Sequence, residues 1–218
     1  MMSLDRLQDR YAFGLGKAAM ALGEEYTLFR PTGAMGPLNP SNKRLRLKVA
    51  LSGQGQGWRP APDPAEPLWS AMMDTTYTQP GDYLCGPLGT FFIAAQPPLL
   101  PTLCVQTSRE LRVTRPDGAL SCGVNGYGGV QSAEMTLILD GWPASVVMGR
   151  TGGHHGGELP GEPGPPMWTI RLPPLPASVT EPLLPGDILS DSCGFSVVIG
   201  TAEPSSYGWR LSAAEAMI

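Results

Sequence analysis

The chain has 218 residues, a formal net charge of −4 and only 16% charged residues, against roughly 25% in an average soluble domain. This length allows one large or two small domains, and the 42% hydrophobic content argues against a disordered chain. The acidic balance argues against nucleic-acid binding over the whole surface. No apolar run is long enough for a membrane span, and the charged first residues predict no secretory signal.

The N-terminal segment predicts a helix. Ser3 is suited to an N-cap, apolar residues from Leu4 to Leu22 recur near helical spacing, and Gly23 is suited to the end. The predicted helix is either continuous or broken at Phe13–Gly16, where two glycines lie. We expect it to belong to an N-terminal arm over residues 1–30.

A strand is predicted from Arg44 to Leu51, because apolar and basic residues alternate there. Its basic face consists of Arg44, Arg46 and Lys48. Such a face is usually solvated, and the alternative is a contact with an acidic partner surface. We therefore treat these three residues as the candidate partner contact.

One pattern occurs twice at a constant spacing of 105 positions: Pro-Gly-Asp-x-Leu, a glycine five residues after the leucine, and an apolar run. Proline presets φ, glycine permits positive φ, and aspartate accepts hydrogen bonds from its own turn. Each copy therefore predicts a turn, a short strand, a tight loop and a buried strand, with the aspartate in the turn and the leucine buried. The copies are Pro80, Gly81, Asp82, Leu84 and Gly89, and Pro185, Gly186, Asp187, Leu189 and Gly194.

The remaining segments also read as β structure, so the predicted fold class is mainly β. We expect antiparallel barrel or sandwich units with a duplicated strand-turn-strand motif, long Gly/Pro loops and one N-terminal helix. Asp140-Gly141-Trp142-Pro143 predicts a hairpin turn between two strands. The predicted organisation is a β domain over 31–148, a Gly/Pro loop over 149–166, and a second β unit over 167–218 that either stands apart or packs in the same domain.

No residue set predicts a catalytic, cofactor or metal site. His154 and His155 are the only histidines and lie among glycines, whereas a catalytic base needs a rigid, oriented imidazole. Cys122 begins a glycine-rich turn that lacks the strand-then-helix context of a nucleophile turn or phosphate loop. Asp82 and Asp187 could form a carboxylate pair, but their identical turn contexts favour a structural role.

Several short segments resemble a known group of proteins. They are Arg30-Pro31, Gly81-Asp82-Tyr83-Leu84, Gly89 to Gln96, Leu99-Leu100-Pro101, Gly186-Asp187-Ile188-Leu189 and Tyr207 to Leu211. In this order they resemble uncharacterised virion proteins of tailed phages and prophages. More remotely, each Gly-Asp-x-Leu unit resembles the small β-barrel of phage head-completion (stopper) proteins, where a strand-turn-strand unit forms part of a ring subunit.

The resemblance implies a structural virion component with no enzymatic activity and no cofactor: a subunit of the head-to-tail connector, the neck or a tail ring. Its implied partners are other virion proteins (neck, portal, adaptor or tail) and further copies of itself in a homo-oligomeric ring, with neither a membrane nor a sequence-specific nucleic acid. The implied location is the virion, and the host bacterial cytoplasm during assembly.

Two alternatives stay open. The chain could be a β-sandwich module that decorates a capsid or binds a receptor or glycan, in which case exposed aromatic rings would mark its site. The candidate rings are those of Trp58, Trp69, Tyr77 and Tyr127, although aromatic rings more often fill cores. A phage-type hydrolase is the minor alternative, and it would need His154 or His155 together with Cys122 or an acidic group.

Overall fold

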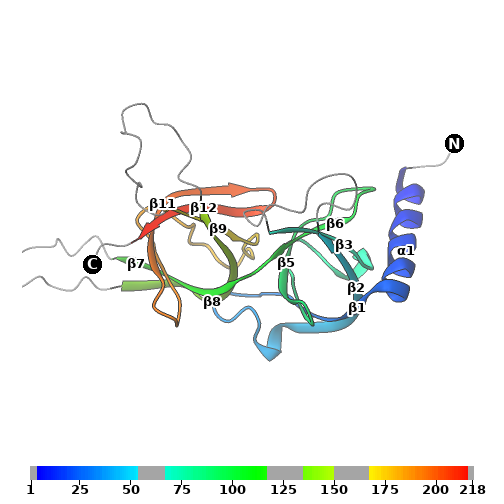
Figure 1. Cartoon of the computed structure of the whole chain (residues 1–218), viewed down its shortest axis with the longest axis horizontal. Coiled ribbons are helices and arrows are strands. Elements are labelled where there is room, and N and C mark those ends of the chain that lie inside the picture. The colour runs from blue at the N-terminus through cyan, green and yellow to red at the C-terminus, as the bar shows by residue number, and fades with distance from the viewer. Residues whose placement is uncertain (1–3, 54–66, 117–134, 150–166, 216–218) are drawn as a thin grey trace, which may run out of the picture.

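The computed structural model describes residues 4–53, 67–116, 135–149 and 167–215. Within these ranges, helix α1 (Leu4–Leu22) precedes two closed, six-stranded antiparallel β-barrels. Figure 1 shows α1 at one end of an elongated molecule, with barrel 1 next to it and barrel 2 at the far end. The predicted fold class is therefore confirmed, and the β units are barrels.

The two barrels have the same strand order. Reading around each barrel from its first strand gives β1-β2-β3-β6-β5-β4 and β7-β8-β9-β12-β11-β10. Barrel 1 consists of β1 (Glu24–Phe29), β2 (Lys43–Gly53), β3 (Leu68–Met72), β4 (Tyr83–Gly86), β5 (Gly89–Ala95) and β6 (Thr102–Gln106). Barrel 2 consists of β7 (Arg109–Pro116), β8 (Met135–Gly149), β9 (Met167–Leu172), β10 (Ile188–Ser190), β11 (Ser196–Ser205) and β12 (Gly208–Glu215). The duplication thus extends from the sequence pattern to the whole barrel.

Helix α1 is continuous, so the predicted alternative of a break at Phe13–Gly16 is wrong. It packs on β2 and β3 of barrel 1, and Ala19 is its fully buried contact. The amide of Gly23 donates to the carbonyl of Ala19 at 2.8 Å and ends the helix. The helix therefore lies against barrel 1 and is not a free arm.

Each barrel interior is filled by alternate residues of its strands, as the period of two in a strand requires. In barrel 1 these include Tyr26, Leu28, Leu84 and Phe91, all nearly inaccessible to solvent. The neighbouring side chains point out of the barrel. One row of them, paired strand to strand, consists of Phe29, Tyr83, Phe92, Val105 and Leu68, which we call the inner row.

The inner row packs against barrel 2 and forms one continuous core with it. Tyr83 donates its hydroxyl to the carbonyl of Pro143 at 2.8 Å and makes an edge-to-face contact with Trp142. The indole nitrogen of Trp142 donates to the carbonyl of Ala34 at 2.6 Å. These apolar and hydrogen-bonded contacts join the barrels into one rigid unit.

The predicted hairpin turn at Asp140-Gly141-Trp142-Pro143 is wrong, because β8 continues through this segment. Gly141 has a φ of 68°, and the pairing of β7 with β8 shifts between Leu111 and Val113. The Asp-Gly pair therefore forms a bulge, which re-aims a side chain without ending the strand. Here it places Trp142 between the barrels.

The strands also group differently from the predicted domains. The barrels meet at the short connection Thr107–Ser108 between β6 and β7, and the predicted division at 149–166 instead falls between two strands of barrel 2. Strands β7 and β8, which we assigned to a domain over 31–148, pair with β9 and β10. The repeat located only one strand pair in each barrel, so it could not show which other strands belonged to it.

Candidate functional site

Both copies of the Pro-Gly-Asp-x-Leu motif form the same turn. The amide of Gln79 donates to the carboxylate of Asp82 at 2.9 Å, and that of Leu184 donates to Asp187 at 2.8 Å. Gly81 and Gly186 have φ values of 96° and 94°. The prediction that both aspartates lie in turns and accept bonds from nearby backbone N–H groups is confirmed.

The rest of the motif is confirmed with one change of register. Leu84 and Leu189 both have 0% exposure and lie inside their barrels. The spacing between paired residues is one longer in the second copy, because Leu84 pairs with Phe91, seven positions on, whereas Leu189 pairs with Val197, eight positions on. Phe92 and Val197 are both buried as predicted, but the structural counterpart of Phe92 is Val198.

An arginine clamps each of the two buried aspartates, and this clamp was not predicted. Arg30 donates to both carboxylate oxygens of Asp82 at 2.8 Å, and Arg115 donates to those of Asp187 at 2.7 and 3.0 Å. The hydrogen bond to each carboxylate raises the pKa of its arginine, against the opposing effect of burial. Each carboxylate is therefore fixed in a bidentate pair, and the two lie in different barrels rather than together.

The two arginines occupy equivalent positions. Leu28 and Val113 pair with the motif leucines, so Arg30 and Arg115 both lie two residues further along the strand. Each is followed by proline, so an Arg-Pro dipeptide recurs 85 positions apart. The dipeptide also occurs at Arg59-Pro60, so the sequence alone does not single out these two arginines, whereas the strand pairing does.

The candidate partner contact lies on the outer face of β2. Arg46 pairs with Glu25 at 3.2 Å, and the ammonium of Lys48 donates to the carbonyl of Gly23 at 3.3 Å, next to the end of α1. Arg44 is exposed. The stripe is thus partly engaged within barrel 1, and one side of it borders α1.

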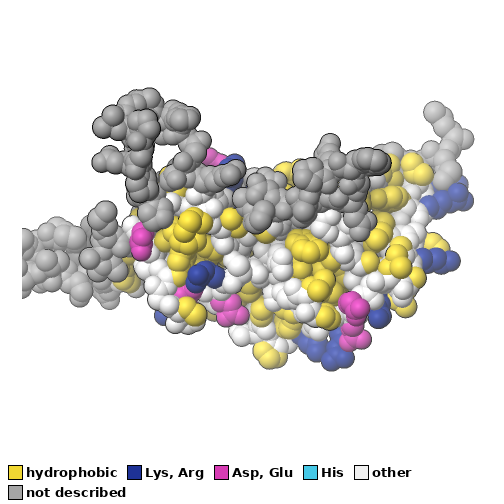
Figure 2. Space-filling model, viewed as in Figure 1, with side chains coloured by type: hydrophobic (Ala, Val, Ile, Leu, Met, Phe, Trp, Pro, Cys, Tyr) yellow, Lys and Arg dark blue, Asp and Glu magenta, His cyan; other side chains and the backbone are white. Residues whose placement is uncertain are grey.

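A groove of about 680 Å³ runs between α1 and this stripe. Its walls carry three large apolar side chains that are mostly exposed: Phe13 (66%), Met20 (72%) and Tyr77 (60%). The ammonium of Lys17 lies 4.7 Å from the centre of the Phe13 ring. Figure 2 shows Lys and Arg side chains beside hydrophobic ones at this end of the molecule. Apolar side chains with a cationic border are suited to a protein contact.

Most of the candidate residues for the hydrolase and the binding module lie outside the described ranges. This holds for His154, His155 and Cys122, and for the aromatic candidates Trp58 and Tyr127. Among the described residues, no group of three or more His, Cys, Asp or Glu side chains is placed to hold a metal ion. The described cysteines, Cys85, Cys104 and Cys193, are free thiols.

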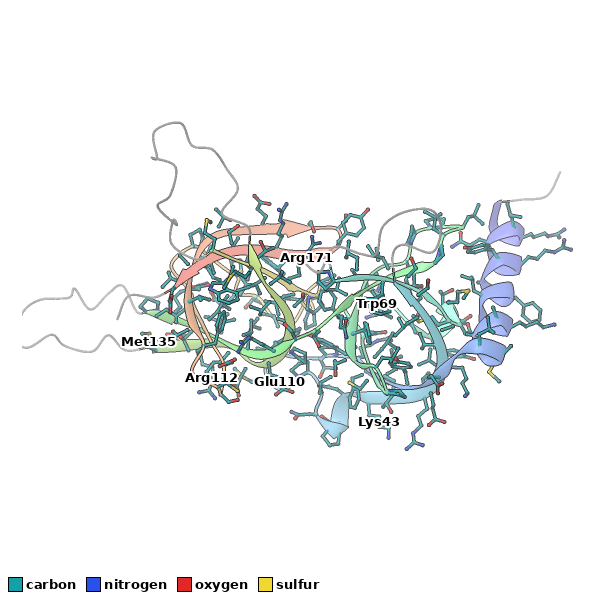
Figure 3. All side chains as sticks on the ribbon, viewed as in Figure 1. Lys43, Trp69, Glu110, Arg112, Met135 and Arg171 are labelled. Atoms are coloured by element: carbon teal, nitrogen blue, oxygen red, sulfur yellow. The ribbon has the colours of Figure 1, made fainter. Side chains whose placement is uncertain are left out.

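The two described aromatic candidates differ in their surroundings. Trp69 is half-buried and packs edge-to-face on Phe91 inside barrel 1, 5.7 Å between ring centres. Figure 3 labels Trp69 within barrel 1. Tyr77 is exposed in the groove beside α1. Of the two described candidates, only Tyr77 is therefore an exposed ring, and it does not share a surface with Trp69.

No protein-family model, curated protein or solved structure matches the chain. Of the described helices, none is sufficiently long and apolar to cross a membrane. Any function must therefore be argued from the residues and geometry of this chain.

Proposed function

We propose that the chain is a non-enzymatic structural subunit of a tailed-phage particle, placed in the head-to-tail connector, the neck or a tail ring. The observation that carries this proposal is the role of the duplicated motif. Its glycines and aspartates form the turns, its leucines fill the interiors of the two barrels, and each of its aspartates is paired with an arginine. What the described surface offers at the α1 end is an apolar contact area.

The architecture supports an assembly role. Two barrels joined by a buried aromatic interface form a stiff body, and stiffness lowers the cost of docking. A low content of charged residues is typical of chains that keep much of their surface against neighbours. The groove beside α1, which Arg46 and Lys48 line, is together with the neighbouring exposed Arg44 the proposed contact with other virion proteins. The protein would act in the virion, and in the host cytoplasm during assembly.

Mass spectrometry of purified particles tests the proposal directly. We expect the chain in the particles at a fixed multiple per virion, in the same fraction as the portal and tail proteins. Its absence from intact particles would refute the proposal.

The contact surface can be tested in the same particles. Charge reversal of the exposed arginines, Arg44→Glu with Arg46→Glu, is expected to lower incorporation without unfolding the chain. Arg210→Glu is the matched control, because it reverses an exposed charge on barrel 2. Equal incorporation of the double variant and the control would show that this surface is not needed for assembly.

A further inference from the structure

Barrel 2 carries its own copy of the inner row. Following the strand pairs from Thr114 gives Thr114, Ile188, Val198, Ala214 and Met167, which we call the open row. These residues match Phe29, Tyr83, Phe92, Val105 and Leu68 position for position. Each row starts at the residue after the pairing partner of the motif leucine, and both rows cross their barrels in the same strand order.

The two rows differ in what covers them. In the inner row Tyr83 and Phe92 have 0% exposure and Val105 has 2%, because barrel 2 packs on them. In the open row Ile188, Val198 and Ala214 are half-buried and Met167 is 47% exposed. Four of the five positions of the open row are nonetheless apolar. Leu137, the other strand neighbour of Thr114, adds a side chain that is 41% exposed.

The contact between the two barrels shows which kind of surface packs on such a row. Barrel 2 contacts the inner row partly through β8, where the carbonyl of Pro143 accepts from Tyr83 and the Trp142 ring packs against the Tyr83 ring. The position on β2 that matches Pro143 is Lys48, because Lys48 pairs with Glu25 and Pro143 pairs with the equivalent Glu110. Lys48 donates to the carbonyl of Gly23, next to the end of α1. The part of barrel 1 that corresponds to this contact of barrel 2 therefore lies beside α1.

The molecule therefore has two different ends. One end is α1 with the groove and its exposed Phe13 and Met20, and the far end is formed by barrel 2 (Figure 1), which carries the open row. The two halves of the described chain also differ in charge. The described residues of α1 and barrel 1 include eight Lys or Arg and six Asp or Glu, whereas those of barrel 2 include five and seven. A positive surplus in one half and a negative surplus in the other favour contact between unlike halves of two copies.

We propose that the open row binds the α1 end of a second copy of this chain, so that copies associate head to tail. The inference rests on the proposed function, in which the α1 end contacts a virion protein, and it names a second copy of this chain as that protein. Because the two surfaces are different, the contact is heterologous, and repetition gives a ring where the rotation closes and a filament where it does not.

Two variants, each with one end impaired, test the proposal by sedimentation velocity over a concentration series. Val198→Glu places a charge in the open row, and Phe13→Glu places one at the α1 end. We expect the wild-type chain to form species larger than dimers as its concentration rises. Each variant alone should be monomeric, and an equimolar mixture should give a dimer and nothing larger, since only one intact contact can form.

Tyr207→Glu and Leu100→Glu are the matched controls, because both replace exposed apolar residues outside the two surfaces; they should associate like the wild type. Circular dichroism checks folding, and Met167→Glu replaces Val198→Glu if the latter unfolds.

Self-association of either end variant alone would show a contact between like ends and overturn the proposal. A wild-type chain that stays monomeric at every concentration would overturn it as well. Detection in particles is a separate measurement, so a chain found in virions yet monomeric would refute only the head-to-tail contact.

Discussion

The buried carboxylates directly before β4 and β10 need more hydrogen-bonding partners than other buried side chains of this fold. Removing an ionised carboxylate from water is costly unless it is paired and hydrogen-bonded. Asp82 has a side-chain exposure of 0% and Asp187 of 1%, and each receives both an arginine and a backbone amide. The arginine thus ties the end of the first strand of each barrel to the turn before the fourth.

Removal of a clamp should destabilise its barrel. Asp82→Ala removes the carboxylate that accepts from Arg30 and from the Gln79 amide, and should lower the free energy of unfolding by about 3 kcal/mol. The estimate is at the low end for buried pairs because the Arg30 side chain is 29% exposed. Asp187→Ala should cost a similar amount. Urea denaturation measures both, with Glu25→Ala as the control, since its pair with Arg46 is exposed on both sides and should contribute under about 1 kcal/mol.

The two motif glycines, Gly81 and Gly186, allow a matched pair of substitutions that tests the barrel interface. Both have positive φ, so alanine at either position should cost about 1–2 kcal/mol through backbone strain. A Cβ at Gly186 would meet no heavy atom within 4 Å, whereas one at Gly81 would lie 2.9 Å from the carbonyl oxygen of Pro174 in barrel 2. Gly81→Ala should therefore destabilise the chain more than Gly186→Ala in the same denaturant series. Equal losses would mean that Pro174 moves aside.

At the scale of the element, α1 contains a glycine that its fold does not need. A Cβ at Gly14 would meet no heavy atom within 4 Å, and the residue is exposed. Gly14→Ala should raise stability by about 0.5–1 kcal/mol by lowering the entropy of the unfolded chain. Hydrogen exchange of the α1 amides should slow accordingly. Gly23→Ala is the opposite case, because its Cβ would lie 2.5 Å from the carbonyl oxygen of Ala19, and it should speed exchange.

The strand-turn-strand elements were predictable because each motif residue has a local reason for its place. The arginine clamp was not predicted, because Arg30 precedes its aspartate by 52 positions and Arg115 by 72, so the repeat of 105 does not include it. The Asp140-Gly141 pair was misread since a hairpin turn and a bulge both use positive φ at glycine. Only long-range pairing separates them, and it places Trp142 at the barrel interface.

At the scale of the whole molecule, the barrels should unfold together. Trp142 is fully buried and contacts Tyr83 and Ala34 across the interface. Trp142→Ala should cost about 3–5 kcal/mol and separate one calorimetric transition into two, because it removes contacts that couple the barrels. Leu189→Ala should cost about 2–5 kcal/mol within barrel 2 alone and keep a single transition. Two transitions in the wild-type chain would contradict a coupled unit.

The covered inner row has a consequence for the order in which the chain is made. Translation completes barrel 1 at Gln106, while Trp142 and the rest of barrel 2 still lie ahead on the ribosome. In that interval a folded barrel 1 presents Tyr83 and Phe92 to the solvent, and transiently exposed apolar surface promotes misassembly. The nascent protein is thus most prone to aggregate when barrel 1 is complete and barrel 2 has not yet been made. A fragment of residues 1–108 should aggregate or bind a hydrophobic dye, and Tyr83→Lys with Phe92→Lys should render that fragment soluble.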